Sequence, residues 1–469
     1  MDIPLIIPGN QVALPRNLYY LHEGPRGGPC LKCTPAVPSP WLDLSSTHPQ
    51  PVRAGFIQAG ILYVLIGSGF YKTTNKVTYS LIGSVSTLSG RAKMICNGTQ
   101  IMVAIYGVNA YVYDISAETL TIISDTDLPA IQSITAQDTY ALVVSEDTAD
   151  FYVCTAGDYT AWDPLDYEEA NRQPDNLVGS ESLDGELWEF GTDSIELYIH
   201  DGTAAFPFKK VQAVDHSIGL GAADSLAVGD TSIFFLDNMD RIRRSIGYAT
   251  KQISTEKIEQ EIADMSTVSD AKGFTINWYG SWWYVITFPT GNKTFIYDIS
   301  ASAKLESSVW YRWTSYPDQA AHRINQYLGY FNREHLIGDR DNGIIWKLDG
   351  SLYHDNGHEI ISEWTSPHIP DKGQRQPWSF FELDMQPGVG LTNDLVSPAA
   401  GSTPSARLEY SDDNGKTWTV KGYREIGEKG EYEKRMVWRR LGMTRRKGRI
   451  FRAVISSPVE RTIYEARGG

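Results

Sequence analysis

The side chains that could bind a metal are scattered along the chain. Of the four cysteines, only Cys30 and Cys33 lie close together, and no second ligand pair follows at the spacing of a zinc site. Asp339, Asp341 and Asn342 lie in the segment GDRDNG, but their spacing and the missing distal Glu differ from an EF-hand loop. The nine histidines show no metal-binding spacing such as HExxH. We therefore expect no metal and no cofactor, packed reduced cysteines, and a tight hairpin turn at GDRDNG.

One segment near the C-terminus has the residue spacing of a carbohydrate-enzyme motif. Ser411, Asp413, Gly415, Thr417 and Trp418 fit the Asp-box pattern Ser-x-Asp-x-Gly-x-Thr-Trp, in which the carboxylate binds turn amides and the Trp packs beneath. Sialidases carry this motif repeatedly, and their catalysis needs an arginine cluster with Tyr and acid partners at the centre of a propeller. This chain has one copy, and arginine is sparse in its apolar segments. We expect no catalytic residues and no enzyme activity, with a structural role for the motif.

The strongest charge feature is the segment 434–452, which contains nine Lys or Arg and no acidic residue. Residues 421–469 carry fourteen basic and six acidic residues, a balance of +8. Since the whole chain carries −15, residues 1–420 carry −23. This separation predicts a surface that meets an acidic partner at one end, while the rest of the molecule repels nucleic acid. We predict that this surface consists of Lys434, Arg435, Trp438, Arg439, Arg440, Arg445, Arg446, Lys447, Arg449 and Arg452.

Two other interpretations of the basic segment stay open at the level of sequence. Its arginines could be solvated or paired on a twisted strand pair, with Trp438 buried inside a C-terminal unit instead of anchoring an interface. Alternatively, the segment could contact the phosphate backbone of passing DNA, without sequence specificity and with a steep dependence on salt. Direct recognition of base sequence would need a helix or ribbon shaped for the major groove, which nothing else in the chain supports.

The composition indicates an all-β protein with more than one unit. The 41 Gly, 26 Tyr and 13 Trp favour short strands joined by tight turns. A length of 469 residues exceeds what one compact core usually holds. The longest uncharged window, residues 54–71, contains Gln58 and four glycines, so it predicts a strand-turn-strand unit and no membrane span. Asp2, Pro4 and Pro8 interrupt the first apolar stretch, which does not resemble a cleavable secretion signal.

Apolar hairpins recur between residues 50 and 365 at a spacing of about 40 to 50 residues, the period of β-propeller blades. Each has two apolar runs, and in most of them Asn, Asp or Gly lies between the runs, as a hairpin connection requires. The units begin at Gly60, Thr99, Thr139, Gly185, Thr231, Gly280 and His335. The pattern predicts a β-propeller of six or seven blades.

The remaining segments suggest a division into three parts. Residues 1–50 are proline-rich and aperiodic, and we predict an extended arm laid over a neighbouring molecule. Residues 51–366 are predicted to form the propeller, and residues 367–469 a C-terminal β unit that carries the basic surface. One helix is predicted at residues 254–265, with Ser254 or Thr255 as its cap and with Ile258, Ile262 and Met265 on one face.

Several segments, taken in order, resemble the tail-hub or nozzle proteins of short-tailed bacteriophages (podoviruses), the packaged-DNA stabilisation protein family. The resemblance covers nearly the whole chain, from Asn17-Leu18-Tyr19 through the segment 219–225 to the late segments. The most specific matches are residues 338–349, Tyr353-His354-Asp355-Asn356-Gly357 and Val437-Trp438-Arg439-Arg440-Leu441-Gly442. The chain departs from the family pattern at Glu363-Trp364-Thr365, so contacts there are expected to differ.

The resemblance implies a structural virion protein. Such a subunit forms a six-fold ring below the portal and its head-to-tail adaptor, extends the DNA channel, stabilises packaged DNA and conducts it during ejection. The implied partners are identical copies in a hexameric ring, portal and adaptor proteins, tail spikes, fibres or a needle, and passing double-stranded DNA bound without sequence specificity. The implied location is the phage tail of the virion, after assembly in the host cytoplasm.

Two alternatives stand beside this interpretation. The first is a glycan-binding or sialidase-like propeller that acts as a receptor-binding tail component, which the Asp-box and the aromatic content support. The second is a propeller scaffold for protein contacts in a cell, which composition does not exclude.

Overall fold

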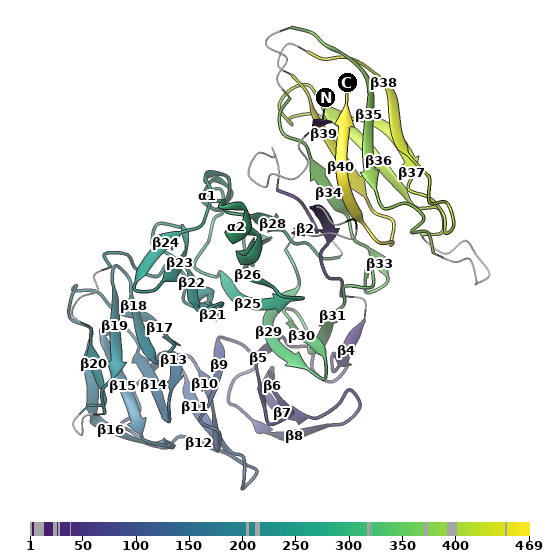
Figure 1. Cartoon of the computed structure of the whole chain (residues 1–469). Coiled ribbons are helices and arrows are strands. Elements are labelled where there is room, and N and C mark those ends of the chain that lie inside the picture. Colours follow the sequence, from purple (N-terminus) through teal and green to yellow (C-terminus); the bar gives the residue numbers. More distant parts are fainter. Residues whose placement is uncertain are drawn as a thin grey trace.

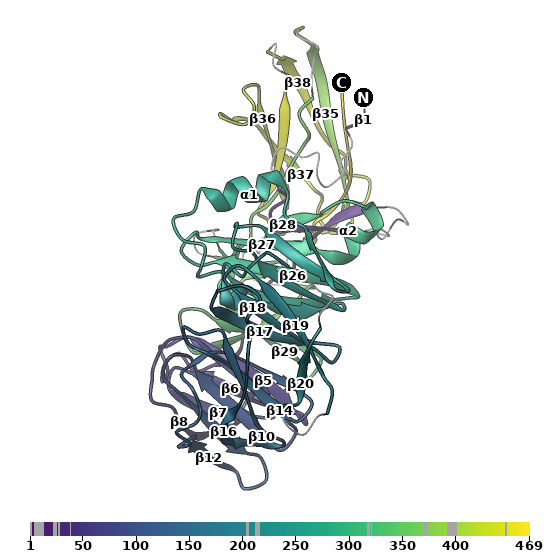
Figure 2. The ribbon, with the colours of Figure 1, turned by 90° about the vertical axis from the view of Figure 1, so that its left-hand side faces the viewer.

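A computed structural model describes residues 2–3, 14–21, 26, 29–37, 39–202, 206–211, 216–316, 319, 321–369, 374–391, 401–445 and 448–469. Two regions built almost entirely from strands follow each other along the chain, a β-propeller and a C-terminal β-sandwich (Figure 1). The turned view shows the sandwich standing on one end of the propeller (Figure 2). No helix in these ranges is both long enough and apolar enough to cross a membrane.

Seven four-stranded antiparallel sheets form the blades of the propeller in the described ranges. Blades 1 and 2 consist of β5 (Val52–Gln58), β6 (Ile61–Ile66), β7 (Gly69–Thr73) and β8 (Tyr79–Ser84), and of β9 (Ala92–Cys96), β10 (Gln100–Ile105), β11 (Asn109–Asp114) and β12 (Thr119–Ile122). Blades 3 and 4 consist of β13 (Ile131–Gln137), β14 (Tyr140–Ser145), β15 (Asp150–Thr155) and β16 (Asp158–Glu169), and of β17 (Leu177–Leu183), β18 (Glu186–Gly191), β19 (Ile195–His200) and β20 (Phe208–Lys210).

The remaining blades complete the ring. Blades 5 and 6 consist of β21 (Ala227–Gly229), β22 (Ser232–Leu236), β23 (Ile242–Ile246) and β24 (Ala249–Gln252), and of β25 (Lys272–Trp278), β26 (Ser281–Phe288), β27 (Lys293–Asp298) and β28 (Trp310–Arg312). Blade 7 consists of β29 (Ile324–Phe331), β30 (Glu334–Asp339), β31 (Ile344–Leu348) and the N-terminal strand β4 (Pro40–Asp43). Because β4 pairs with β31, a strand from before blade 1 completes blade 7 and joins the two ends of the propeller.

Each hairpin predicted from the sequence is the pair of middle strands of one blade. The unit beginning at Gly60 corresponds to β6 and β7, and the unit beginning at His335 corresponds to β30 and β31. The middle strands are largely buried, as in β6 with its run of five buried residues, because neighbouring blades cover both of their faces. The prediction of a propeller is therefore confirmed, and the choice between six and seven blades is settled at seven.

The C-terminal sandwich has two packed sheets. One contains β38 (Met436–Met443), β35 (Pro377–Met385), β40 (Thr462–Gly468), β3 (Cys30–Cys33) and β2 (Leu18–Leu21), with β1 (Asp2–Ile3) beside β40. The other contains β34 (Ser362–Thr365), β39 (Ile450–Ile455), β36 (Ser405–Ser411) and β37 (Thr419–Glu425). A short hairpin of β32 (His354–Asp355) and β33 (His358–Glu359) precedes it along the chain.

The first fifty residues differ from the predicted extended arm where the structure describes them. The strands β2 and β3 pair within their own subunit and join the sandwich, and β4 joins blade 7. The apolar residues Leu18, Tyr20 and Leu31 explain this, because they are buried in the subunit's own core. The strands also cross the boundaries of the three predicted parts. The propeller strand β4 lies before residue 51, and the sandwich strand β34 lies before residue 367.

Two α-helices and one 3-10 helix occur in the described ranges. The helix α1 (Glu256–Ala263) is the predicted one, shortened at both ends, and it buries Ile258 and Ile262 against blades 5 and 6. Its N-cap residue makes no side-chain cap, and the Ser254 hydroxyl instead donates to Glu259 at 2.8 Å. The sequence did not predict α2 (Ile299–Leu305) or the 3-10 helix η1 (Ala223–Ser225).

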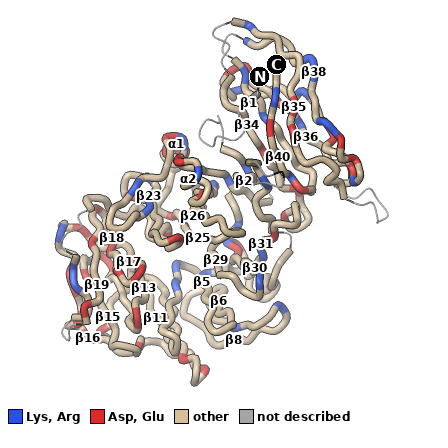
Figure 3. The backbone as a smooth tube through the Cα atoms, viewed as in Figure 1, with Lys and Arg blue, Asp and Glu red and all other residues tan. Residues whose placement is uncertain are grey.

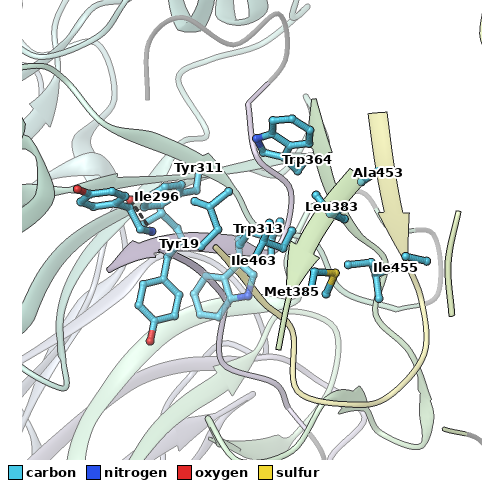
Figure 4. Close-up of a cluster of buried hydrophobic side chains, with 14 of the residues drawn as sticks. Tyr19, Ile296, Tyr311, Trp313, Trp364, Leu383, Met385, Ala453, Ile455 and Ile463 are labelled. Atoms are coloured by element: carbon cyan, nitrogen blue, oxygen red, sulfur yellow. Dashed lines mark hydrogen bonds between the residues drawn. The ribbon is translucent and has the colours of Figure 1, made fainter. Parts of the chain in front are cut away.

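One hydrophobic core runs from the sandwich into blades 6 and 7. It contains Trp364 and Ile455 from one sheet of the sandwich, Leu383 from the other, and Tyr311 from blade 6 (Figure 4). The N-terminal residues Leu18, Tyr19 and Tyr20 belong to the same core. The N-terminal segment therefore connects the sandwich to the propeller through buried apolar side chains.

Candidate docking surface of the sandwich

The basic segment forms the edge strand β38, the connection that follows it and the first residues of β39 in the other sheet. The strand β38 pairs with β35, and its register shifts between the pair Phe380 with Arg439 and the pair Trp378 with Gly442. Arg440 lies within this shift and has a φ of 57°. A non-glycine residue rarely adopts this left-handed backbone, which here gives the geometry of a β-bulge.

The bulge changes which side chains reach solvent. Successive residues of a regular strand point to opposite faces, so two neighbouring arginines would not normally share one. On β38, however, Arg439 and Arg440 are both exposed, while Trp438 and Leu441 on either side are buried. Arg445, just beyond the strand, is also exposed. Among the described residues of the predicted surface, these three arginines are exposed and form no ion pair within 4.0 Å, although Arg439 helps to lower the pKa of Glu382.

Two further residues of the predicted surface, half-buried Lys434 and exposed Arg435, are paired within the subunit. Lys434 Nζ lies 2.7 Å from a carboxylate oxygen of Glu425 and 3.2 Å from one of Glu431. Arg435 donates two hydrogen bonds to Glu382, at 2.8 and 2.9 Å, although 72% of its side-chain surface is exposed. The hydrogen bonds from Arg435 lower the pKa of Glu382. Both cations therefore contribute less net charge to the surface than the sequence indicates.

Trp438 and Arg449 are corrections to the predicted surface. Trp438 is 0% exposed, and its indole N–H donates to the carbonyl of Gly422 at 2.9 Å. Arg449 is 2% exposed and donates to both carboxylate oxygens of Asp412, at 2.7 and 2.9 Å. Neither side chain is available to a partner on this surface, because the first fills the sandwich core and the second holds the turn after β36.

The last residues of the predicted set have different positions. Arg452 is half-buried, donates to Glu409 at 2.7 Å, and places its guanidinium 4.0 Å from the ring centroid of Trp418. Arg446 and Lys447 lie outside the described residues.

The neighbouring strand β37 adds two cations that sequence reasoning missed. Lys421 Nζ donates to the carbonyl of Arg440 at 2.7 Å, and Arg424 Nε donates to the carbonyl of Val437 at 2.8 Å. Both contacts bring a β37 side chain onto β38, although the two strands belong to different sheets. Their place beside the basic segment was hard to predict from the sequence, because four acidic residues separate Lys421 and Arg424 from that segment. Figure 3 shows Lys and Arg of this part of the sandwich near β38.

The Asp-box is a structural turn of the sandwich. Asp413 accepts from the amide of Thr417 at 2.9 Å and from the hydroxyls of Ser411 and Thr417, and these hydrogen bonds lower its pKa. The amide of Gly415 donates to the Ser411 hydroxyl at 2.8 Å. The motif joins β36 to β37 and so lies outside the seven propeller sheets.

The centre of the propeller is spanned by ion pairs between blades that are not adjacent. Lys93 of blade 2 lies 2.9 Å from Glu181 of blade 4. Arg91, also from the inner strand region of blade 2, lies 2.8 Å from Asp224 in η1 beside blade 5. These pairs hold Lys93 and Arg91 against carboxylates of the propeller itself.

The other candidate chemical groups are also accounted for by structure. Asp339 of GDRDNG accepts from the amide of Asp341 at 2.7 Å and from the indole of Trp346 at 2.6 Å, as expected for a hairpin turn. All four cysteines are free thiols, and burial raises the pKa of Cys154 to about 11. No cluster of three or more His, Cys, Asp or Glu that could hold a metal occurs in the described part of the chain.

Two protein-family models match the chain. The boundary between them lies after the last propeller strand, β31, and before the sandwich strand β34. The family model described as bacteriophage P22 Gp10, beta-propeller, matches residues 42–353. The model described as bacteriophage P22 Gp10, beta-sandwich, matches residues 362–467. The chain belongs to the bacteriophage P22 Gp10 family. This is a family of tail proteins of short-tailed phages, so the chain is a structural component of a phage tail and assembles with other virion proteins.

Comparisons with individual proteins add little to the P22 Gp10 assignment. No curated protein sequence matches the chain. Among solved structures, PorZ of Porphyromonas gingivalis is 8% identical with a TM-score of 0.41, and the match covers 71% of this chain and 44% of PorZ. BamB from Moraxella catarrhalis is 9% identical with a TM-score of 0.40, covering 64% of this chain and 83% of BamB. The WD40 propeller domain of Doa1 is 10% identical with a TM-score of 0.41, covering 64% of this chain and 93% of that domain. Likenesses of this size carry no argument about function.

Proposed function

We propose that the protein is a nozzle subunit of a short-tailed phage. Copies of the chain form a closed ring of six below the portal and its head-to-tail adaptor, extend the DNA channel, retain the packaged genome and conduct it during ejection. The role is structural and not enzymatic, and the ring is assembled in the host cytoplasm. Membership of the P22 Gp10 family supports the place in the tail.

The observation that carries the docking part of this proposal is the bulge on β38. Left-handed backbone at a residue other than Gly costs free energy, and such residues are enriched where function requires them. Here the bulge sets Arg439 and Arg440 side by side in solvent on an edge strand. Together with Arg445 they form a cationic surface, to which an acidic surface of the adaptor or portal ring is complementary.

The charge distribution supports a role next to DNA. Residues 1–420 carry a net charge of −23, so most of the outer surface repels phosphate. The centre of each propeller is spanned by the pairs of Lys93 with Glu181 and of Arg91 with Asp224. The genome therefore passes through the middle of the ring of subunits, along their anionic outer surfaces, and not through a propeller.

A double charge reversal tests the docking surface. With Arg439→Glu and Arg440→Glu, we expect subunits that fold normally, because both side chains are exposed, but no longer attach to the connector. Phage particles carrying this variant should lose their packaged DNA, measured as the DNA content of purified heads, and negative-stain images should show heads without the ring.

A matched control separates docking from net charge. The variant Lys209→Glu with Lys251→Glu reverses two exposed cations on the outer strands β20 and β24 and changes the net charge by the same amount. It should assemble and retain DNA. Normal assembly and genome retention in the Arg439 and Arg440 double variant would refute the proposed surface, and purified protein that never forms annular oligomers would refute the ring.

A further inference from the structure

A cavity of about 750 Å³ lies between blades 6 and 7, at the ends of the hairpins β25–β26 and β29–β30. Its size is within the range of sites that hold small organic ligands. Aromatic rings form much of its lining, notably Trp278, Tyr279, Tyr327 and Tyr330. Gly350 lies beside two of these rings, and an added Cβ would stand 3.0 Å from the Trp278 ring and 3.4 Å from the Tyr279 ring, so a larger residue there would crowd them.

Tyr279 at the mouth of the cavity has no counterpart in the other blades. It is the first residue of the two-residue turn between β25 and β26, with a φ of 47°. In the other described blades with a positive φ at this turn position, the residue is Ala59, Asp138, Asp184, Asp230 or Asn332. Asn and Asp tolerate left-handed backbone, whereas a bulky aromatic residue rarely adopts it.

Packing in the core does not explain why a tyrosine occupies this turn position. The ring makes an edge contact with Trp278 at a centroid distance of 4.9 Å, yet 84% of the residue is exposed. Tyr330 from blade 7 lines the same cavity and is 58% exposed. The fold therefore holds two tyrosine rings in solvent, one of them on unfavourable backbone, beside a preformed cavity. This combination indicates a binding function.

The polar lining indicates the chemistry of the ligand. Two cations, Arg333 and Lys347, and two carboxylates, Glu334 and Asp349, face the cavity, so its charges balance. Lys347 Nζ lies between the two acids, 3.7 Å from Glu334 and 3.4 Å from Asp349. Burial lowers the pKa of His335, whose ring accepts or donates a hydrogen bond with the Tyr327 hydroxyl at 2.8 Å. The cavity thus offers donors and acceptors in similar number and no net charge.

We propose that this cavity binds a neutral oligosaccharide, a function separate from the ring and channel. Each sugar hydroxyl both donates and accepts, which matches the mixed lining. The apolar face of a sugar ring packs on an exposed aromatic ring such as Tyr279. A proline-rich peptide is the other ligand class that aromatic grooves bind, but it presents mainly carbonyl acceptors, whereas a sugar hydroxyl can also donate to the carboxylates of Glu334 and Asp349 in the lining.

Saturation-transfer NMR on the full-length protein tests the proposal. The probes are methyl glycosides of glucose, galactose, mannose, rhamnose and N-acetylglucosamine and their neutral disaccharides, at millimolar concentration, with a polyproline peptide in parallel. We expect transfer to the ring protons of at least one neutral sugar. The variant Tyr279→Asn should weaken that binding at least about tenfold, which corresponds to the loss of one substantial contact.

The same variant distinguishes binding from folding. Asparagine is the residue at the equivalent turn of blade 7, Asn332, so Tyr279→Asn should leave the thermal unfolding temperature unchanged or raise it. The control Tyr248→Ala removes another exposed hairpin tyrosine, in blade 5 and outside the cavity, and should leave sugar binding unchanged. Binding of the peptide but of no sugar, no binding of any probe, or equal sugar binding by Tyr279→Asn would each overturn the proposal.

Discussion

The propeller and the sandwich distribute their hydrophobic cores differently. Six separate clusters in the described residues each lie between two neighbouring blades, such as the cluster of Leu183 and Phe235 between blades 4 and 5. The seventh cluster is continuous, and runs from both sheets of the sandwich through the N-terminal segment into blades 6 and 7 (Figure 4). Most of the propeller is therefore stabilised locally, blade by blade, whereas the sandwich and the last two blades share one core.

This difference predicts how damage spreads. In an array of repeating units, each unit contacts only its neighbours, so a defect weakens one interface and the units beside it. A defect in a continuous core instead weakens all the elements that share it. A docking force applied to the sandwich would accordingly be transmitted to blades 6 and 7 more than to the other blades.

The largest expected effect comes from removing one buried indole in each region. Trp364→Ala acts on the continuous core and Trp188→Ala on the cluster between blades 4 and 5, and both side chains are 0% exposed. Each variant should lower the free energy of unfolding by about 5 kcal/mol, the cost of deleting a large buried aromatic side chain. Hydrogen exchange should show faster exchange in the sandwich and blades 6 and 7 for Trp364→Ala, but only in blades 4 and 5 for Trp188→Ala. Identical exchange patterns would contradict the comparison.

Asn17 holds the junction between the two regions by polar contacts. Its backbone has a φ of 52°, and its side chain accepts from the amide of Thr314 and donates to the carbonyl of Ile361, both at 2.8 Å. The variant Asn17→Ala removes the partner of the buried Thr314 amide and that of the partly buried Ile361 carbonyl. At about 2 kcal/mol for each group, the free energy of unfolding should fall by about 4 kcal/mol, measurable by urea denaturation.

The matched control for Asn17 is Asn332→Ala. Asn332 also has a positive φ, 48°, but its side chain makes one exposed hydrogen bond, to the carbonyl of Thr74 at 3.1 Å. This variant should cost about 1 kcal/mol or less. Equal losses for the two variants would show that backbone conformation matters at position 17 and that the junction contacts do not.

The sequence revealed the parts of the fold whose pattern is local. The middle strands of the blades are buried on both faces, so they appear as paired apolar runs, and seven such units were found. The outer strands β8 and β12 carry exposed residues such as Leu81 and Ile122 and have no comparable pattern. The place of β4 in blade 7 was not predictable from local pattern, because its partner β31 lies about three hundred residues later in the chain.

The candidate surface shows the same limit. Charge alone identified β38 as the basic strand, and it could not distinguish exposed Arg439 from buried Arg449. Arg449 is paired with Asp412, which lies 37 residues earlier in the connection between β36 and β37. Trp438 is covered by β37. The bulge that exposes Arg440 depends on the register against β35, which follows from packing and not from the sequence of β38.

The smallest effect concerns a carboxyl group in the part of the continuous core that belongs to blade 6. Asp298 caps α2 and also accepts hydrogen bonds from Trp283 and Tyr311, and its burial raises its pKa from 3.8 to about 6. Between these two values, the unfolded chain has already lost the proton that the folded protein keeps. Asp298 therefore contributes less stability as the pH rises from about 4 to about 6, by at most about 3 kcal/mol.

The variant Asp298→Asn should remove this slope while keeping the oxygen that accepts from the amide of Ala301. Its free energy of unfolding relative to the wild type should rise across this pH interval, measured by urea denaturation at several pH values. Asp114 is the control with the opposite sign, since hydrogen bonds from the amide of Ala117 and from Ser116 lower its pKa. Its contribution is lost as the pH falls below about 4, so Asp114→Asn should change the profile only there. A flat difference between Asp298→Asn and the wild type from pH 4 to 6 would mean that water reaches this carboxylate, and that the shared core is less closed at blade 6 than its buried side chains indicate.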